Sequence, residues 1–193
     1  MKKNKPKYRQ IIEAAVQVIA ENGYHSSQVS KIAKQAGVAD GTIYLYFKNK
    51  EDILVSVFEE KMGEFIQKTS KEIKKHEYAN DQLHALIEMH FRQLAENSHL
   101  AVVTQLELRQ SNLDLRFQIN QVLLPYLQLI DEVIQKGIEE NTFKDDLHIP
   151  LVRQMIFGTI DEIVTTWVVK DHKYNLVELV DPVHKMLIGG IRV

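Results

Sequence analysis

Apolar residues recur along most of this chain at intervals of three and four positions, the spacing that places them on one face of an α-helix. The first stripe predicts a helix over residues 8–22 that ends at Gly23, a residue suited to the turn after a helix. Further stripes predict helices over residues 29–36, 41–47, 50–75, 81–96, 99–110, 112–140, 149–170 and 175–190. The pattern therefore predicts an all-α fold of about nine helices, in which Pro125 introduces a kink and Pro182 kinks or interrupts the last helix.

Residues 28–51 carry the pattern of a helix, a tight turn and a second short helix. Gly37 stands at the turn, where a positive φ favours glycine, and Asp40 is placed to cap the second helix. Ile43 and Phe47 face inward on that helix. This spacing is typical of a helix-turn-helix, whose second helix enters the major groove of DNA. A helical hairpin within an all-α core is the alternative.

Polar side chains left over from packing in this region are candidate DNA contacts. Lys50 begins the next helix, where the helix dipole disfavours a cation, so a phosphate is its natural partner. Asn49 is placed to cap that helix, and Ser26 and Ser27 to cap the first helix of the motif. The candidate DNA-binding residues are Ser27, Gln28, Asp40, Gly41, Thr42, Tyr44, Tyr46, Lys48 and Lys50.

Charge is distributed unevenly along the chain, although the net charge is only -2. Residues 1–50 hold nine Lys and Arg against three acids, whereas the remainder holds 15 basic and 23 acidic residues. A basic head on an acidic body favours DNA binding at one end of the molecule. Residues 1–7 are predicted to form a basic arm that reaches phosphates or the minor groove.

Composition narrows the class of protein further. The 193 residues contain no Cys, which excludes disulfides and thiolate metal sites and suits a cytoplasmic location. We find no signal sequence and no apolar run of membrane-spanning length. We also find no nucleophile, phosphate-binding or H-E-x-x-H motif, and His84 and His90 lack the spacing of a helical metal pair. We therefore expect no enzyme activity, no catalytic cofactor and no metal.

Polar residues interrupt the apolar stripes of the body at two places. Gln105, Arg109 and Asn112 are spaced as one stripe, and Gly158 lies within an otherwise apolar helix that also carries Asp161. A buried Asp161 would need a partner, for which Arg109 is the natural candidate. The pair would serve either a ligand or the structure alone. The last two predicted helices are the most apolar, which indicates either a dimer interface or the core of a monomer.

The run IIEAAVQVIAENGYHSSQVSKIAKQAGVADGTIYLYFKNKEDIL resembles the DNA-binding domain of TetR-type transcriptional repressors over residues 8–54. Ala39 departs from the Ser that this family usually carries at the cap of the recognition helix. Within the family, TQLELRQSNLDLR and RQMIFGTIDEIVTTWV are similar to the repressors of fatty-acid degradation of Gram-positive bacilli. The resemblance implies a helix-turn-helix DNA-binding domain over residues 1–49 and a helical ligand-binding and dimerisation domain over residues 50–193.

What the resemblance implies about function is a homodimer, paired through its last two helices, that binds a palindromic operator and is released by long-chain acyl-CoA. An apolar tunnel would hold the acyl chain, with Arg109 at its mouth. The other candidate ligand-binding residues are Phe91, Leu94, Val103, Leu106, Phe157, Gly158, Ile160, Asp161 and Val164. The alternative is a TetR-type repressor that senses a different hydrophobic or cationic ligand, with Asp161, Glu162 and Trp167 in its pocket.

Overall fold

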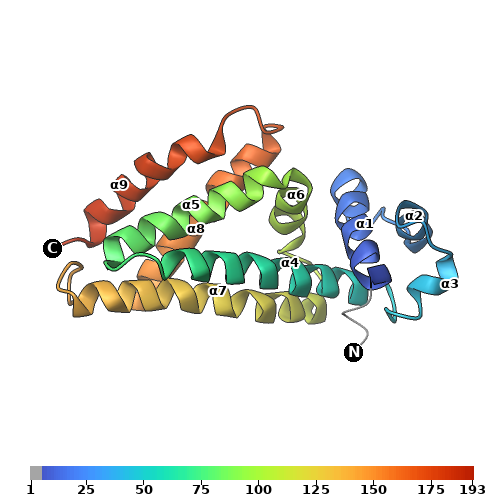
Figure 1. Ribbon diagram of the computed structural model, residues 1–193, viewed down its shortest axis with the longest axis horizontal. Helices are drawn as coiled ribbons and strands as arrows, with labels where there is room; N and C mark the ends of the chain where they lie inside the picture. The colour runs from blue at the N-terminus through green and yellow to red at the C-terminus, as the bar shows by residue number, and fades with distance from the viewer. Residues whose placement is uncertain (1–5) are drawn as a thin grey trace. The chain divides into compact units, whose positions relative to one another are not determined.

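A computed structural model describes residues 6–193, and these residues fold into α-helices with one short 3₁₀ helix, η1 (Figure 1). The elements are α1 Pro6–Asn22, α2 Val29–Gln35, α3 Asp40–Ile43, α4 Lys50–Ile73, α5 Ala79–Glu96, α6 Ser98–Glu107, α7 Leu113–Glu139, α8 Ile149–Val169, η1 Leu176–Leu179 and α9 Val180–Ile191. The all-α prediction is confirmed. In the described part of the chain no helix is both long enough and apolar enough to cross a membrane. Most of the predicted basic arm lies outside the described residues.

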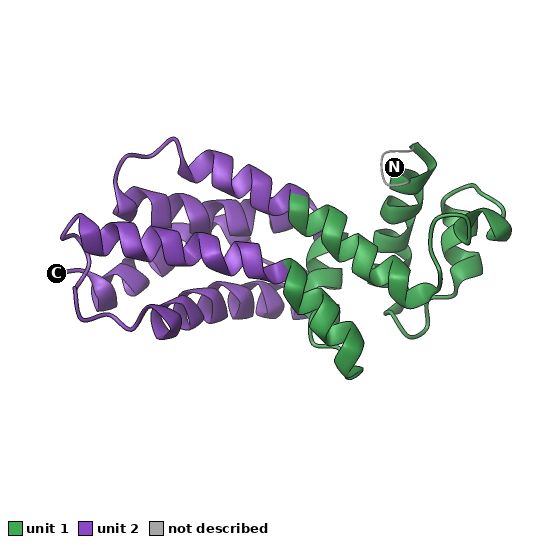
Figure 2. Cartoon of the chain, turned by 90° about the horizontal axis from the view of Figure 1, so that it is seen from below, with its two compact units in different colours: residues 1–63, 99–122 green, residues 64–98, 123–193 purple. Residues whose placement is uncertain are grey.

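The chain divides into two compact units, which Figure 2 draws in green and purple. Unit 1 combines residues 1–63 with residues 99–122, and unit 2 combines residues 64–98 with residues 123–193. Helix α6 and the first part of α7 therefore belong to the same unit as the helix-turn-helix. The predicted boundary at residue 50 separates a DNA-binding domain from a ligand-binding domain rather than two compact units, and it stays a prediction.

The core of unit 1 forms where α1, α2, α3 and the start of α4 meet. Ile11, Ile32, Ile43 and Leu54 are completely buried there. Gly23 and Gly37 have φ of 72° and 62°, so the two turns use the left-handed conformation that the sequence predicted at Gly37 and after the first helix. The local signals of the helix-turn-helix are thus confirmed.

Three predicted details of helix capping differ from the structure. Asp40 is the first residue of α3, and the N-cap of this helix is Ala39, so no side chain caps it. The helix ends at Ile43 rather than at Phe47. The N-cap of α2 is Gln28, also without a side-chain bond, so Ser26 and Ser27 are not its caps. Helix α3 thus begins one residue earlier, and α2 one or two residues later, than the capping side chains indicated, because neither helix uses a side-chain cap. The Asn49 prediction is confirmed: its Oδ1 accepts from the Asp52 N–H at 2.8 Å.

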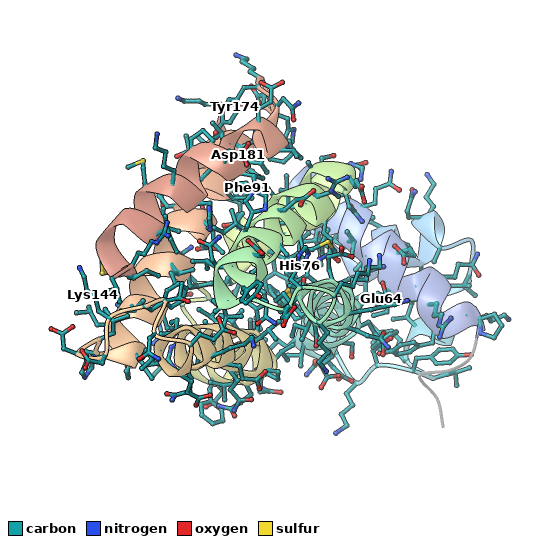
Figure 3. All side chains as sticks on the ribbon, turned by 60° about the vertical axis from the view of Figure 1, so that its left-hand side comes forward. Glu64, His76, Phe91, Lys144, Tyr174 and Asp181 are labelled. Carbon is teal, nitrogen blue, oxygen red and sulfur yellow. The ribbon has the colours of Figure 1, made fainter. Side chains whose placement is uncertain are left out.

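Unit 2 is built on α5, which packs against α8, η1 and α9. Phe91, on α5, lies inside this unit and is fully buried, whereas Asp181, on α9, is exposed (Figure 3). Gly137, on α7, lies under the ring of Phe143, and a Cβ at this glycine would come within 2.1 Å of that ring. A glycine is therefore required for the loop after α7 to close over the helix.

Of two expectations about the later helices, one was right in part and one was wrong. The predicted helix over residues 175–190 is interrupted rather than kinked: η1 ends at Leu179, and Pro182 lies in the first turn of α9, where a proline costs no backbone hydrogen bond. Helix α6 ends at Glu107, and Asn112 caps α7 by accepting from the Leu115 N–H at 3.0 Å. Gln105, Arg109 and Asn112 therefore do not share one helical stripe. Pro125 does lie inside α7, as predicted.

Candidate functional site

The outer surface of the helix-turn-helix carries most of the predicted DNA contacts. Tyr44 is 58% exposed, Lys48 is exposed, and Lys31 and Lys34 add two exposed cations from α2. Gln28, Asp40 and Gly41 are also exposed, and Thr42 is half-buried. Cations and polar groups thus surround the short helix α3, as phosphate binding requires.

Three predicted DNA contacts are engaged within the protein. Ser27 is buried, and its hydroxyl donates to the Gly23 carbonyl at 2.7 Å, so the prediction that it bonds a phosphate is corrected. Tyr46 is half-buried, with its ring centroid 6.3 Å from that of Tyr8. The Lys50 ammonium donates to the His25 carbonyl at 2.9 Å. The partners of these three side chains lie on α1 or in the loop after it, and helical spacing within the motif does not predict such contacts.

A cluster of polar groups, which we call the Glu107 cluster, joins the end of α6 to the turn after α1 within unit 1. The Tyr24 backbone N–H donates to Glu107 Oε1 at 2.9 Å, and Gln110 Nε2 donates to Glu107 Oε2 at 2.5 Å. Lys50 Nζ lies 4.5 Å from the centroid of the Tyr24 ring. Burial, with the nearby charges of Glu51 and Glu107, raises the pKa of Tyr24 to about 12. Burial lowers the pKa of Lys50, and the negative charge of Glu107 opposes that shift.

A second polar group, the His90–Tyr126 pair, lies in the interior of unit 2. His90 Nδ1 is 2.8 Å from Tyr126 Oη, and both side chains are buried. His90 Nε2 is buried and has no hydrogen-bond partner among the described residues. Burial lowers the pKa of His90 to about 3, so the imidazole is neutral at physiological pH. Burial, with the charge of Asp161, raises the pKa of the Tyr126 hydroxyl.

Aromatic rings surround this pair. The Phe65 ring meets His90 edge to face at 5.6 Å and Tyr126 at 5.5 Å, and Phe157 meets Tyr126 at 6.2 Å between centroids. Phe157 also lines a surface pocket of about 460 Å³ between α7 and α8, together with Leu127 and Arg153. Nothing in the sequence indicates the pairing of His90 with Tyr126, because the two residues are 36 positions apart.

The predicted ligand-binding residues fall in both units. In unit 2, Phe91, Leu94, Ile160, Asp161 and Val164 are buried and Phe157 is half-buried. Gly158 is exposed and nothing lies within 4 Å of a Cβ built on it, so it faces away from the interior of its own unit. In unit 1, Val103 is buried, whereas Leu106 is 53% exposed and Arg109 is exposed. The interior of unit 2 thus brings together six of the predicted residues.

The exposed faces of α8 and α9 carry large apolar side chains among polar ones. Met155 and Met186 are 58% and 80% exposed, and a groove of about 480 Å³ between the two helices is lined by both methionines and by Leu151. In the described part of the chain, no group of three or more His, Cys, Asp or Glu residues could hold a metal ion.

Comparisons with known proteins match the chain along almost its whole length. Residues 11–57 match the model of the bacterial regulatory proteins of the tetR family, and residues 58–190 match that of the C-terminal region of YsiA-like proteins. The fatty acid metabolism regulator protein of Bacillus subtilis (strain 168) is 60% identical over 191 residues, which cover 99% of this chain and 98% of the relative.

Two solved structures have the same fold. The fatty acid degradation regulator FadR from Bacillus halodurans is 59% identical with a TM-score of 0.92. FadR from Bacillus subtilis, crystallised in complex with stearoyl-CoA, is 60% identical with a TM-score of 0.93. Each comparison covers 96% of this chain and 100% of the other. The helix-turn-helix has the predicted turns and the second unit is helical, in agreement with these matches. This chain therefore belongs to the TetR family of bacterial transcriptional regulators.

Proposed function

We propose that this protein is a cytoplasmic repressor of fatty-acid degradation genes, which binds operator DNA as a homodimer and is released by long-chain acyl-CoA. The observation that carries the proposal is the 60% identity, over 96% of this chain, to a regulator crystallised with stearoyl-CoA. The match covers 96% of this chain, so it includes both units. A TetR-type repressor for a different hydrophobic or cationic ligand is the second candidate.

The interior of unit 2 has the character that an acyl chain requires. Phe91, Leu94, Ile160 and Val164 give it an apolar and aromatic lining. The neutral His90–Tyr126 pair adds a polar atom, His90 Nε2, that has no acceptor or donor among the described residues. Apolar walls with a few placed polar groups are typical of small-molecule sites. A cationic ligand would instead favour several acids, and Asp161 is the buried acid of this region.

The dimer forms through the exposed faces of α8 and α9. Met155 and Met186 would be buried there, and nothing lies within 4 Å of a Cβ built on Gly158, Gly189 or Gly190, which would allow a second copy to approach these helices closely. A palindromic operator requires a reader with two-fold symmetry. Met186→Asp places a charge in this face and is expected to sediment as a monomer. If the variant remained a dimer, the interface would lie elsewhere.

The ligand would act by shifting a population of conformations. Without ligand, the dimer places its two copies of α3 in successive major grooves. Acyl-CoA binds better to a second arrangement, in which the two copies of α3 cannot enter successive grooves together. The ligand shifts this balance only by its difference in affinity for the two arrangements. Arg109 and Val103 belong to unit 1, the unit that carries the helix-turn-helix.

The test is a gel shift with promoter DNA of a fatty-acid oxidation operon. The full-length protein is titrated with stearoyl-CoA, and with free stearate and free coenzyme A as controls. Release of the DNA by stearoyl-CoA alone is the expected result. Retained DNA in all three titrations would overturn the acyl-CoA assignment and favour the second candidate. Absence of binding to any DNA, including a random pool, would overturn the repressor function itself.

A further inference from the structure

The outer side of the recognition region carries a large apolar side chain that no contact explains. Leu45 is 64% exposed, and it is the only pure hydrocarbon side chain exposed between residues 40 and 48. It follows α3 directly, with its N–H donating to the Thr42 carbonyl at 3.2 Å. A leucine that is 64% exposed leaves most of its apolar surface in contact with solvent in the unbound protein.

The direction of Leu45 is fixed by its neighbours. Ile43 and Phe47 are buried, and the Phe47 ring stacks on that of Tyr8 at 5.2 Å. Leu45 lies two positions from each of them, and two positions in a helical turn are roughly 200°. Leu45 therefore points away from the core of unit 1. Because its two neighbours are held by packing, the leucine cannot turn inward without unfolding the motif.

The surroundings of Leu45 identify the class of partner. Lys34 and Lys48 are exposed on α2 and after α3, and Tyr44 beside Leu45 is 58% exposed. Cations at this density favour a polyanion. Leu45 has no donor or acceptor, so it cannot bond phosphate, sugar or the polar edge of a base. In the major groove, the apolar feature that a base pair offers is the 5-methyl group of thymine.

We propose that Leu45 determines sequence specificity by packing on the 5-methyl group of one thymine in each half-site of the operator. The inference rests on the proposed DNA-binding function and goes beyond it, because it names the atom that is read and the side chain that reads it. Phosphate contacts from the neighbouring lysines set the register, and Leu45 distinguishes thymine from cytosine and the purines at one position.

The expected effect follows from the small area involved. Removing one methyl contact weakens binding about fourfold, and two symmetric half-sites give about 16-fold for the dimer. A contact of this kind has no charge, so the penalty is expected to be the same at low and at high salt, in contrast to the contribution of Lys34 or Lys48.

The experiment replaces each thymine of the operator by deoxyuridine, which removes only the methyl group. Symmetric positions of the two half-sites are replaced together, in the operator that the wild-type protein selects. Binding is measured by fluorescence anisotropy for the wild type, for Leu45→Ala and for Leu113→Ala. Leu113, which is 68% exposed at the start of α7, serves as a matched control outside the DNA-binding surface. Thermal unfolding checks that Leu45→Ala leaves the fold intact.

One thymine position is expected to show the roughly 16-fold loss with the wild type and with Leu113→Ala. The same replacement should change the affinity of Leu45→Ala less than twofold. The inference is overturned if no position depends on the methyl group, or if Leu45→Ala retains the loss. If the protein binds DNA but stearoyl-CoA does not release it, the thymine dependence still stands and only the ligand assignment fails. If the wild type binds no DNA, both the proposed function and this inference fail.

Discussion

The two units of this protein each bury a polar group, and the two groups differ in how completely they are satisfied. In unit 1, Glu107 is a charged acceptor whose two oxygens both receive hydrogen bonds. In unit 2, the His90–Tyr126 pair is neutral, and His90 Nε2 has no partner among the described residues. A closed network fixes one arrangement of the elements that it joins. An open polar atom in an apolar interior marks a place where a ligand gains a bond that the protein alone lacks.

Removing the charged acceptor should give the largest effect on stability. Glu107→Ala leaves the Tyr24 N–H and the Gln110 amide without their acceptor, and we expect a loss of about 3 kcal/mol in the free energy of unfolding. Glu107→Gln keeps one acceptor oxygen and should lose less. Glu96→Ala, at an exposed position, is the control, with a change within about 0.5 kcal/mol. Urea denaturation measures the stability of all three variants. Equal losses for Glu107→Ala and Glu96→Ala would show that the Glu107 cluster does not stabilise the fold.

The neutral pair should tolerate apolar replacement better than the Glu107 cluster does. Tyr126→Phe leaves a buried imidazole without its hydroxyl partner, at an expected cost of about 2 kcal/mol. Once His90→Phe is already present, no partner is left behind, so adding Tyr126→Phe should cost about 1 kcal/mol less. A double-mutant cycle measured in urea gives this difference. Strict additivity would mean that the 2.8 Å contact between the two residues contributes nothing.

The same pair should make stability depend on pH. The pKa of His90 falls from 6.5 to about 3 on folding, so between these values the unfolded chain binds a proton that the folded chain does not. Stability is therefore full above pH 6.5 and falls as the pH is lowered. At pH 5.5 the loss is about 1.4 kcal/mol. His90→Phe should lose this part of the pH dependence, whereas His99→Gln, at an exposed position, should keep it. An unchanged slope in His90→Phe would contradict the neutral, buried state of His90.

Local sequence signals predicted those parts of the fold that depend on a few neighbouring residues. The turns at Gly23 and Gly37 and the cap at Asn49 follow from single residues and their immediate neighbours, and the structure confirms them. The cap at Asp40 was wrong because two or three nearby residues compete to start a helix, and their side chains alone do not decide between them.

The sequence pattern did not predict the contacts between residues that are far apart along the chain. Tyr24 and Glu107 are 83 positions apart, and His90 and Tyr126 are 36 apart, so helical spacing carries no information about either pair. Among the expected ligand-binding residues, Phe91, Ile160 and Val164 are buried, whereas Gly158, on the same helix as the last two, is exposed. The family resemblance, rather than the pattern, supplied the ligand.

The central claim is that an acyl-CoA site and a DNA site are coupled in this dimer. By linkage, if stearoyl-CoA weakens operator binding by some factor, operator DNA must weaken stearoyl-CoA binding by the same factor. Isothermal titration of stearoyl-CoA into the dimer, with and without saturating operator, measures this directly. We expect a lower affinity for stearoyl-CoA in the presence of operator, by the factor seen in the DNA titrations. An affinity for stearoyl-CoA that operator leaves unchanged would contradict it.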